Sequence, residues 1–276
     1  MTLNHLCIIG AGSIAAELLD TLAHVLEAPL ERLIVLQRAG KTTLPEDMAQ
    51  AASRCAITVQ ASDNLADVIA ARPDLAIECA GHGAVHAYGE QLLENGIETV
   101  IASTGVLADD AWHDRLRRAA QAGQTRLVLP AGAVGGMDIL AALQNGTLDT
   151  VAYTSRKPPH AWRGSPAEAA VDLDSLTGET VFFEGSARRA AVDYPQNANV
   201  AATIALAGAG LDATTVRMIA DPDVQANIHQ IEIASDGAEV QVRIVGKPTA
   251  RNPKTSLPTV YSLVREVMRR RGPIVS

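Results

Sequence analysis

A glycine-rich turn near the start of the chain has the residue types and spacing that hold a pyrophosphate. The segment Gly10-Ala11-Gly12-Ser13-Ile14-Ala15 follows a short apolar run and precedes a stretch rich in Ala and Leu. The first glycine allows a tight turn, the second lets a pyrophosphate approach the backbone, and the final alanine lets helix and strand pack closely. This GxGxxA pattern in a strand–turn–helix context predicts a dinucleotide site formed by Gly10, Gly12, Ser13 and Ile14. The alternative is a glycine turn that binds no nucleotide.

The end of the second apolar run indicates which dinucleotide is bound. An acidic residue there accepts hydrogen bonds from the ribose 2′-hydroxyl, but this chain has Gln37-Arg38 instead. Because a guanidinium neutralises a 2′-phosphate, we predict that NADP is accepted, alone or alongside NAD. The alternative is that Arg38 is solvated or stacks on the adenine.

The chain has seven histidines, and His229 has the setting of a strand residue among apolar neighbours, in Asn227-Ile228-His229-Gln230-Ile231. Histidine suits proton transfer beside a nicotinamide because its pKa lies near neutrality. His229 alternates with Ile228, which predicts that its side chain joins the polar face of the strand. From the pattern alone it is either a catalytic acid–base group or a strand residue at the surface or core edge.

Two other reactive residue types lie close together in the sequence. His82 and His86 have HxxxH spacing, but zinc needs a third ligand and no other His or Cys follows nearby, so we predict no metal site. Cys79 precedes this segment inside an apolar run, where a thiol is normally inert.

Alternating elements surround these residues in the first half of the chain. Continuous apolar runs are typical of strands buried on both faces of a parallel sheet, and six occur, at 6–9, 33–36, 57–59, 75–77, 99–102 and 126–129. Helical stretches separate them, at 13–27, 45–54, 64–71, 84–95 and 109–122. We therefore predict a Rossmann-type, doubly wound α/β domain over 1–130.

The pattern changes after Pro130. A glycine-rich segment leads into a helix at 137–145, and four alternating strands are expected at about 147–156, 213–219, 226–235 and 238–246. Asp236-Gly237 joins the last two as a hairpin signal, and further helices are expected at 185–193 and 199–208. We predict a second, α+β domain with a mostly antiparallel sheet over 131–250, and a helix within 251–276 that packs back on the first domain.

The composition limits the classes of partner. The chain has 23 Lys and Arg against 31 Asp and Glu, a net charge of −8, so nucleic acid and anionic membranes are poor partners. Aromatic residues make up only 3%, so few side chains could stack on bases. No apolar stretch reaches the ~20 residues of a membrane span. The three cysteines are widely spaced, which favours a reducing compartment. An apolar strand is expected from Leu6, so we expect no leader peptide. We expect a soluble, cytoplasmic protein.

Several segments resemble the L-aspartate dehydrogenase family over nearly the whole chain. Besides GxGxxA, these are 129–136 (LPAGAVGG), 155–159 (SRKPP), 183–187 (FEGSA), 195–203 (PQNANVAAT), 220–222 (ADP) leading to His229, and 252–256 (NPKTS). The resemblance implies that His229 is the catalytic histidine and that Ala131 contacts the nicotinamide end of the cofactor. It implies the same contact for Asn197 or Asn199, of which we favour Asn199; the alternative for Asn199 is a helix cap.

The resemblance also implies a reaction, the reversible oxidative deamination of L-aspartate to iminoaspartate, then oxaloacetate and ammonia, with NAD or NADP and a link to NAD biosynthesis. A substrate with two carboxylates needs local cations on an acidic protein, and the candidates are Lys157, His160, Arg163 and Lys254. Each is otherwise a solvated surface charge.

Three alternatives remain open. Homoserine dehydrogenase and dihydrodipicolinate reductase share the two-domain plan, while a semialdehyde dehydrogenase would need a cysteine that 131–136 lacks. A non-catalytic NADP-binding sensor would bind cofactor without turnover. We expect a homodimer in every case, because open-faced antiparallel sheets often pair.

Overall fold

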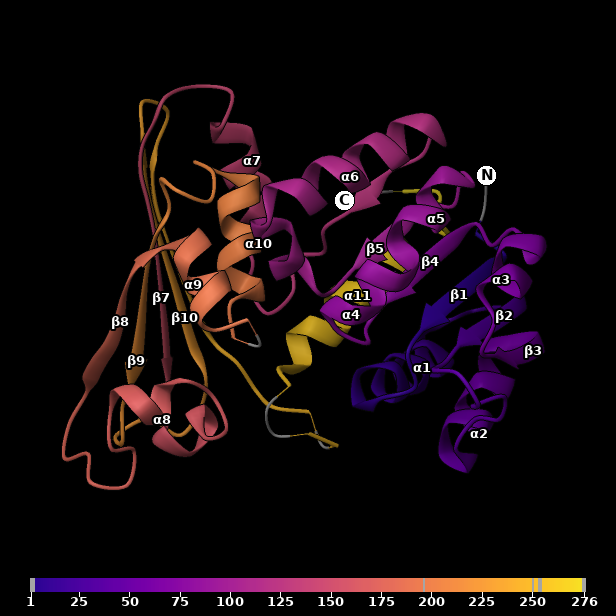
Figure 1. Cartoon of the computed structure of the whole chain (residues 1–276), viewed down its shortest axis with the longest axis horizontal. Coiled ribbons are helices and arrows are strands. Elements are labelled where there is room, and N and C mark those ends of the chain that lie inside the picture. The colour runs from indigo at the N-terminus through magenta and orange to yellow at the C-terminus, as the bar shows by residue number, and fades with distance from the viewer. Residues whose placement is uncertain (1–2, 196, 250, 253–254, 275–276) are drawn as a thin grey trace. The chain divides into compact units, whose positions relative to one another are not determined.

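The structure, a computed structural model, describes residues 3–195, 197–249, 251–252 and 255–274. The chain forms two units (Figure 1). The first comprises Met1–Pro130 and Val260–Ser276, and the second comprises Ala131–Thr259. The segment expected to return to the first domain is therefore divided, with the chain entering the first unit at Val260.

A six-stranded sheet forms the centre of the first unit. Its order is β3-β2-β1-β4-β5-β6 and every neighbouring pair is parallel. All six apolar runs form strands: β1 (His5–Ile9), β2 (Leu30–Leu36), β3 (Ala56–Ser62), β4 (Leu75–Glu78), β5 (Thr99–Ile101) and β6 (Leu127–Val128). The order reverses beside β1, so the carboxyl ends of β1 and β4 border the switch point where such sheets bind ligands.

Helices cover both faces of this sheet. They are α1 (Ser13–Val25), α2 (Glu46–Cys55), α3 (Leu65–Ala71), α4 (His82–Ala84), η1 (Val85–Gly89), α5 (Glu90–Glu94), η2 (Thr104–Ala108), α6 (Asp110–Ala122) and α11 (Leu257–Met268). Leu6 and Ile8 of β1 share a core with α1, α2 and α11. Cys7 and Ile9 point to the other face and pack with α3 and α5. The predicted doubly wound fold is confirmed.

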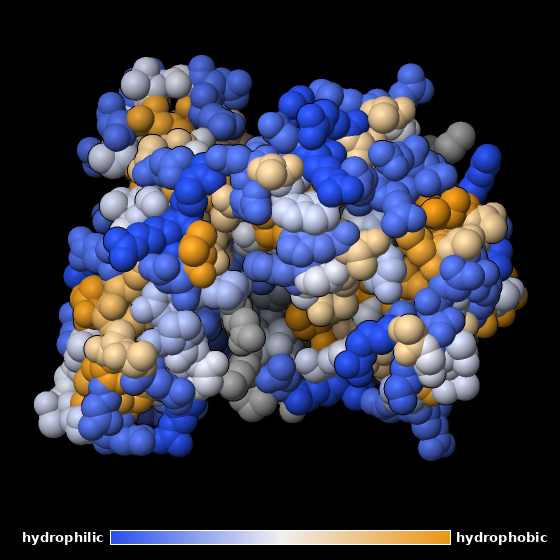
Figure 2. All heavy atoms as spheres, viewed as in Figure 1, coloured by the Kyte–Doolittle hydropathy of each residue, from blue (hydrophilic) through white to orange (hydrophobic). Residues whose placement is uncertain are grey.

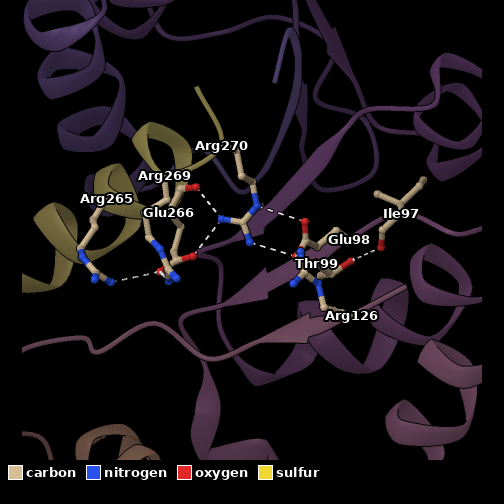
Figure 3. A network of polar contacts seen from close by, with 8 residues as sticks. All are labelled: Ile97, Glu98, Thr99, Arg126, Arg265, Glu266, Arg269 and Arg270. Atoms are coloured by element: carbon tan, nitrogen blue, oxygen red, sulfur yellow. Dashed lines mark hydrogen bonds and ion pairs between the residues drawn. The ribbon is translucent and has the colours of Figure 1, made fainter. Parts of the chain in front are cut away.

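A charged cluster joins α11 to the sheet of the first unit (Figure 3). Arg270 donates to both carboxylate oxygens of Glu98 at 3.0 Å and to Glu266 at 2.8 Å. Arg126 reaches Glu98 from the start of β6 at 2.9 Å. Burial acts to raise the pKa of Glu98, but the two arginines hold it below its ordinary value. Arg270 thus connects two carboxylates that are largely hidden from water.

Removing Arg270 should therefore destabilise the first unit strongly. We expect Arg270→Met to lower the free energy of unfolding by about 3 kcal/mol, because Glu98 and Glu266 would keep buried charges without their main partner. Arg269→Met is the matched control: Arg269 makes one contact to Glu266 at 3.4 Å and is more exposed, so its loss should cost less than ~1 kcal/mol. Urea titration of both variants tests this, and equal losses would contradict it.

A five-stranded mixed sheet forms the second unit. Its order is β11-β10-β7-β9-β8, with one parallel pair, β7 and β9, and three antiparallel pairs. The strands are β7 (Leu148–Lys157), β8 (Thr180–Ser186), β9 (Thr215–Ala220), β10 (Ile228–Ser235) and β11 (Glu239–Val245). The four expected strands and the mostly antiparallel sheet are confirmed. The edge strand β8 was not predicted from the sequence.

Helices α7 (Met137–Leu143), α9 (Ala187–Asp193) and α10 (Asn199–Ala207) lie along one face of this sheet (Figure 1). Short helices η3 (Pro159–Trp162) and α8 (Ala167–Ala170) follow β7 and lie near one end. Most residues of β7, β9 and β10 that point toward the covered face are buried, among them Tyr153, Met218 and Ile231. Chemistry-bearing side chains on that face are therefore screened from bulk water.

The visible surface of the molecule is mainly hydrophilic, with apolar residues in separate groups (Figure 2). Within the described residues, no helix has the length and hydropathy needed to cross a membrane.

Candidate active site

The turn after β1 has the geometry that a pyrophosphate requires. Gly10 has φ +111°, and a Cβ atom there would lie 2.9 Å from the Cβ of Ala80, so only glycine lets the turn approach the end of β4. Gly12 precedes α1, is exposed, and has no heavy atom within 4 Å of its ideal Cβ position. No side chain caps this helix. Its amide groups, with Ser13 and Ile14 in its first turn, fit the phosphates of a dinucleotide.

A buried carboxylate that we did not single out from the sequence organises the neighbouring strand ends. Glu78 closes β4 and is 1% exposed. It accepts hydrogen bonds from the amides of Ala80 and Gly81, both at 2.7 Å, and from the amide and hydroxyl of Ser103. Burial raises the pKa of Glu78, and these four donors oppose that rise. The signal in the sequence was a lone acid ending the run Leu75-Ala76-Ile77.

Arg38 is exposed in a turn that follows β2. The amide of Lys41 donates to the Arg38 carbonyl at 3.1 Å, so two cationic residues belong to one turn. The Gln37 side chain donates to the Thr43 carbonyl, and the Gly40 amide donates to Asp63, which fixes the loop at two further points. The guanidinium is therefore presented from an ordered loop at the carboxyl end of β2.

Arg38→Ala should weaken NADPH binding about 10- to 100-fold, because one charge-assisted hydrogen bond to a phosphate contributes ~1.5–3 kcal/mol. NADH binding should change by less than about threefold, since NADH lacks the 2′-phosphate. Titration followed by the fluorescence of the bound dihydronicotinamide measures both constants. Arg117→Ala, an exposed arginine on α6, is the control. Equal weakening of NADPH and NADH would assign Arg38 to the adenine instead.

His229 lies on β10 in the second unit, and the expectation that it joins the polar face is wrong. Its side chain is 4% exposed and shares the covered face with Ile231 and Ile233, while Gln230 and Glu232 point to the other face. The physical reason is parity: positions 229, 231 and 233 lie on one face of a strand. Ile228, at the end of the strand, is buried as well, so the alternation counted from it placed His229 on the wrong face.

The His229 ring has one hydrogen-bonded and one free nitrogen. Nδ1 lies 2.7 Å from the hydroxyl of Tyr153 on β7. Nε2 is buried and has no hydrogen-bond partner among the described residues. Burial and, to a smaller extent, the positive charge of Lys157 lower the pKa of His229 to about 3. The ring is therefore a neutral imidazole at working pH, with one nitrogen left for a reacting molecule.

Lys157 ends β7 on the same face as Tyr153 and Ser155. Its Nζ lies 4.3 Å from the centre of the Trp162 ring, and Trp162 is fixed by a hydrogen bond to the Ile219 carbonyl. Burial lowers the pKa of Lys157 to about 8. No carboxylate of the described residues forms an ion pair with it in the structure. A half-buried ammonium held on an aromatic ring is a ready partner for an anion.

A polar cavity of about 230 Å³ opens beside Lys157 in the second unit; its lining is Lys157, Ala161, Arg163, Gly164, Ser165, Asn197, Asn227 and Thr255. Of the four cations expected for the substrate, two thus meet in one place. Arg163 is paired with Asp174. His160 is exposed on η3 and is not among the lining residues, and Lys254 lies outside the described residues.

The residues expected at the nicotinamide end lie at different places in the second unit. Ala131 begins the unit in a turn that contains Gly132 with φ +67°. Asn197 lines the cavity beside Lys157. Asn199 is the first residue of α10, whose cap position is Ala198, so Asn199 is not the helix cap.

The HxxxH histidines have other surroundings. His82 begins α4, and His86 stacks on Trp112 with ring centres 4.3 Å apart. Cys79 is buried, which raises its thiol pKa.

A parallel sheet with a pyrophosphate turn, followed by an α+β unit with a buried histidine, defines a two-domain dehydrogenase that uses NAD or NADP. The profile described as "Homoserine dehydrogenase, NAD binding domain" matches residues 10–130. The profile "Aspartate dehydrogenase, C-terminal" matches residues 138–270. With the full-length relatives described next, these matches show that the chain belongs to the aspartate dehydrogenase family.

Two relatives and one solved structure support this membership. The L-aspartate dehydrogenase of Polaromonas sp. is 43% identical, over 96% of this chain and 97% of its own. That of Ruegeria pomeroyi is 45% identical, over 97% and 92%. The crystal structure of aspartate dehydrogenase from Thermotoga maritima superposes with a TM-score of 0.74 at 27% identity, covering 99% of this chain and 98% of that one. The chain is an amino-acid dehydrogenase.

Proposed function

We propose that this protein oxidises L-aspartate with NAD or NADP, giving iminoaspartate and, after hydrolysis, oxaloacetate and ammonia. One observation carries the proposal: the second unit holds a buried neutral histidine and, on the same sheet face, an ammonium without a carboxylate partner among the described residues. The first is a proton acceptor and the second a carboxylate anchor. Oxidation of an amino diacid requires both, and the relatives named above carry that activity in their names.

Each unit offers residues expected to bind the cofactor. Gly10, Gly12, Ser13 and Ile14 would hold the pyrophosphate, and Arg38 would hold the adenosine ribose or its 2′-phosphate. Ala131 and either Asn199 or Asn197 would bind the nicotinamide end, where an amide side chain both donates to and accepts from a carboxamide. The nicotinamide, when bound, accepts a hydride.

His229 would handle the protons of the reaction. With its Nε2 lone pair free, the imidazole takes a proton from the water that adds to the imine carbon. The imidazolium then returns this proton to nitrogen; as the carbonyl of oxaloacetate forms, the adduct's hydroxyl gives its proton back to the imidazole and ammonia leaves. The positive charge that develops on the ring is brief, and the low pKa of His229 favours its prompt release of the proton. The same steps in reverse aminate oxaloacetate.

Cations near His229 would bind the two carboxylates of the substrate. Lys157 is best placed, because it lines the polar cavity together with Arg163. His160 and Lys254 remain further candidates for this role.

Three wider features belong to the same proposal. We expect a homodimer that pairs through the face of the second sheet bearing Gln230 and Glu232, which no helix among the described residues covers. The three cysteines are buried and free, which is consistent with a reducing cytoplasm. Iminoaspartate is a reactive imine, so we expect a second enzyme, one of NAD biosynthesis, to consume it.

Absorbance at 340 nm, with L-aspartate and each cofactor in parallel, tests the reaction directly. We expect reduced cofactor with L-aspartate and none with homoserine. Cofactor binding without turnover in either direction would favour the sensor, and turnover of homoserine would favour the other dehydrogenase class.

A further inference from the structure

Tyr153 and His229 form a buried pair on neighbouring antiparallel strands of the second unit. In the register, His229 lies opposite Ser155, and Tyr153 lies opposite Ile231 two positions along. All four residues point to the covered face. Tyr153 is 1% exposed and His229 is 4% exposed. Their rings are nearly parallel, at 11°, with the Tyr153 hydroxyl 2.7 Å from Nδ1.

This hydrogen bond admits two arrangements of protons. Burial raises the pKa of Tyr153, so it remains a phenol, and His229 remains neutral. If the phenol donates to Nδ1, the ring proton lies on Nε2, and Nε2 cannot accept another. If Nδ1–H donates to the phenol oxygen, Nε2 carries a bare lone pair. The two arrangements therefore make Nε2 a donor or a base.

Ser155 favours the second arrangement. It follows Tyr153 by two positions on β7, so it points to the same face, and it is fully buried. The Ser155 Oγ has no hydrogen-bond partner among the described residues, and its nearness opposes the rise in the phenol pKa. A phenol with a serine oxygen beside it can donate there and accept from Nδ1–H at the same time. With that bond made, the relay would extend from His229 through Tyr153 to the unpartnered Ser155 Oγ.

We propose that Tyr153 is a positioning residue that accepts Nδ1–H of His229 and so presents Nε2 as the proton-accepting atom. The free state of Nε2 among the described residues agrees with this assignment. Lys157, at the end of the same strand face, is the charged group that acts on His229, and its positive charge favours the neutral ring. The inference rests on the proposed function for the role of Nε2, but the tautomer itself does not depend on turnover.

The tautomer is measured by ¹⁵N NMR of protein labelled at histidine, without cofactor, at pH 7.5 to 8. Seven histidines contribute signals, and comparison with His229→Asn assigns those of His229. We expect a protonated Nδ1 and a bare Nε2. A protonated Nε2 would overturn the proposal, whether or not the protein oxidises L-aspartate. A clear Nδ1–H tautomer in a protein without aspartate turnover would instead reject only the proposed function.

Kinetics of Tyr153→Phe provide the second arm. This variant keeps the ring and removes the oxygen, so kcat should fall about 10- to 100-fold as the Nδ1–H tautomer loses its acceptor, while KM changes less than about threefold. The Nε2–H signal should grow in the same variant. Tyr194→Phe, a second buried tyrosine of this unit that packs on Phe183, should keep wild-type kcat. If Tyr153→Phe kept the wild-type kcat and the wild-type tautomer, the Tyr153–His229 hydrogen bond would have only a structural role.

Discussion

Replacing His229 with asparagine is expected to lower kcat for L-aspartate oxidation by about 10²- to 10⁴-fold, the range that general acid–base groups contribute. Asparagine fills similar space and can still bond to the Tyr153 hydroxyl, so the strand pairing of β10 should survive. It cannot take a proton from water. Cofactor affinity should stay within about threefold, because the loss concerns a proton transfer rather than binding.

Initial rates at 340 nm and fluorescence titration with reduced cofactor measure the two quantities on one protein preparation. His24→Asn is the control, since His24 is an exposed histidine on α1 with no role in the proposed site. It should retain wild-type kcat. Near-wild-type turnover in His229→Asn would assign the proton transfer to another group, and a parallel loss of cofactor affinity would indicate a disturbed fold.

The acid stability of this variant provides an internal check on its fold. In the wild type, the pKa of His229 is about 3, against 6.5 in the unfolded chain. The unfolded state therefore binds the proton first as pH falls below 6.5, which costs the folded state of order 3 kcal/mol by pH 4. His229→Asn removes this term. Denaturation by urea at pH 4 and at pH 7 should show a smaller pH-dependent loss in the variant than in the wild type.

The parallel sheet could be predicted strand by strand because each of its strands contains a short, mostly apolar run. The strands β1, β2 and β4 are largely buried on both faces. Their prediction therefore does not require deciding which residues point to the solvent. The edge strand β8 escaped prediction for the opposite reason. Its half-exposed residues and its ending Glu184-Gly185-Ser186 resemble a loop, and only pairing with β9 makes it a strand.

The sequence indicates the residue types of the candidate site but not their environment. His229 was singled out for its chemistry, and its face was assigned wrongly because the alternation was counted from Ile228, which is buried at the strand end. Tyr153 gave no chemical signal, since its partner lies 76 positions away and meets it only through the pairing of β7 with β10. The meeting of Lys157 with Arg163 likewise depends on the turn through η3, which brings Trp162 under the ammonium.

Lys157→Met should lower kcat/KM for L-aspartate by about 10²- to 10³-fold, since truncating one partner of a shielded, hydrogen-bonded charge pair costs ~2–5 kcal/mol. Methionine keeps an unbranched stem over Trp162, so the change removes the charge and little of the packing. The inhibition constant of succinate, which has both carboxylates and no amino group, should rise by a similar factor. Lys247→Met, at an exposed position of the same unit, should leave both values unchanged.

The pH dependence separates the charge of Lys157 from its shape. Because burial lowers its pKa from 10.5 to about 8, the ammonium is intact below pH 8 and is lost as pH rises through that value. Succinate inhibition of the wild type should therefore weaken by about tenfold per pH unit above 8, since only the cation attracts a carboxylate. In Lys157→Met, inhibition should be weak at every pH and should lack this slope. A slope that persists in the variant would assign it to another titrating group, and strong inhibition without a slope would assign the carboxylate to Arg163, whose guanidinium stays charged.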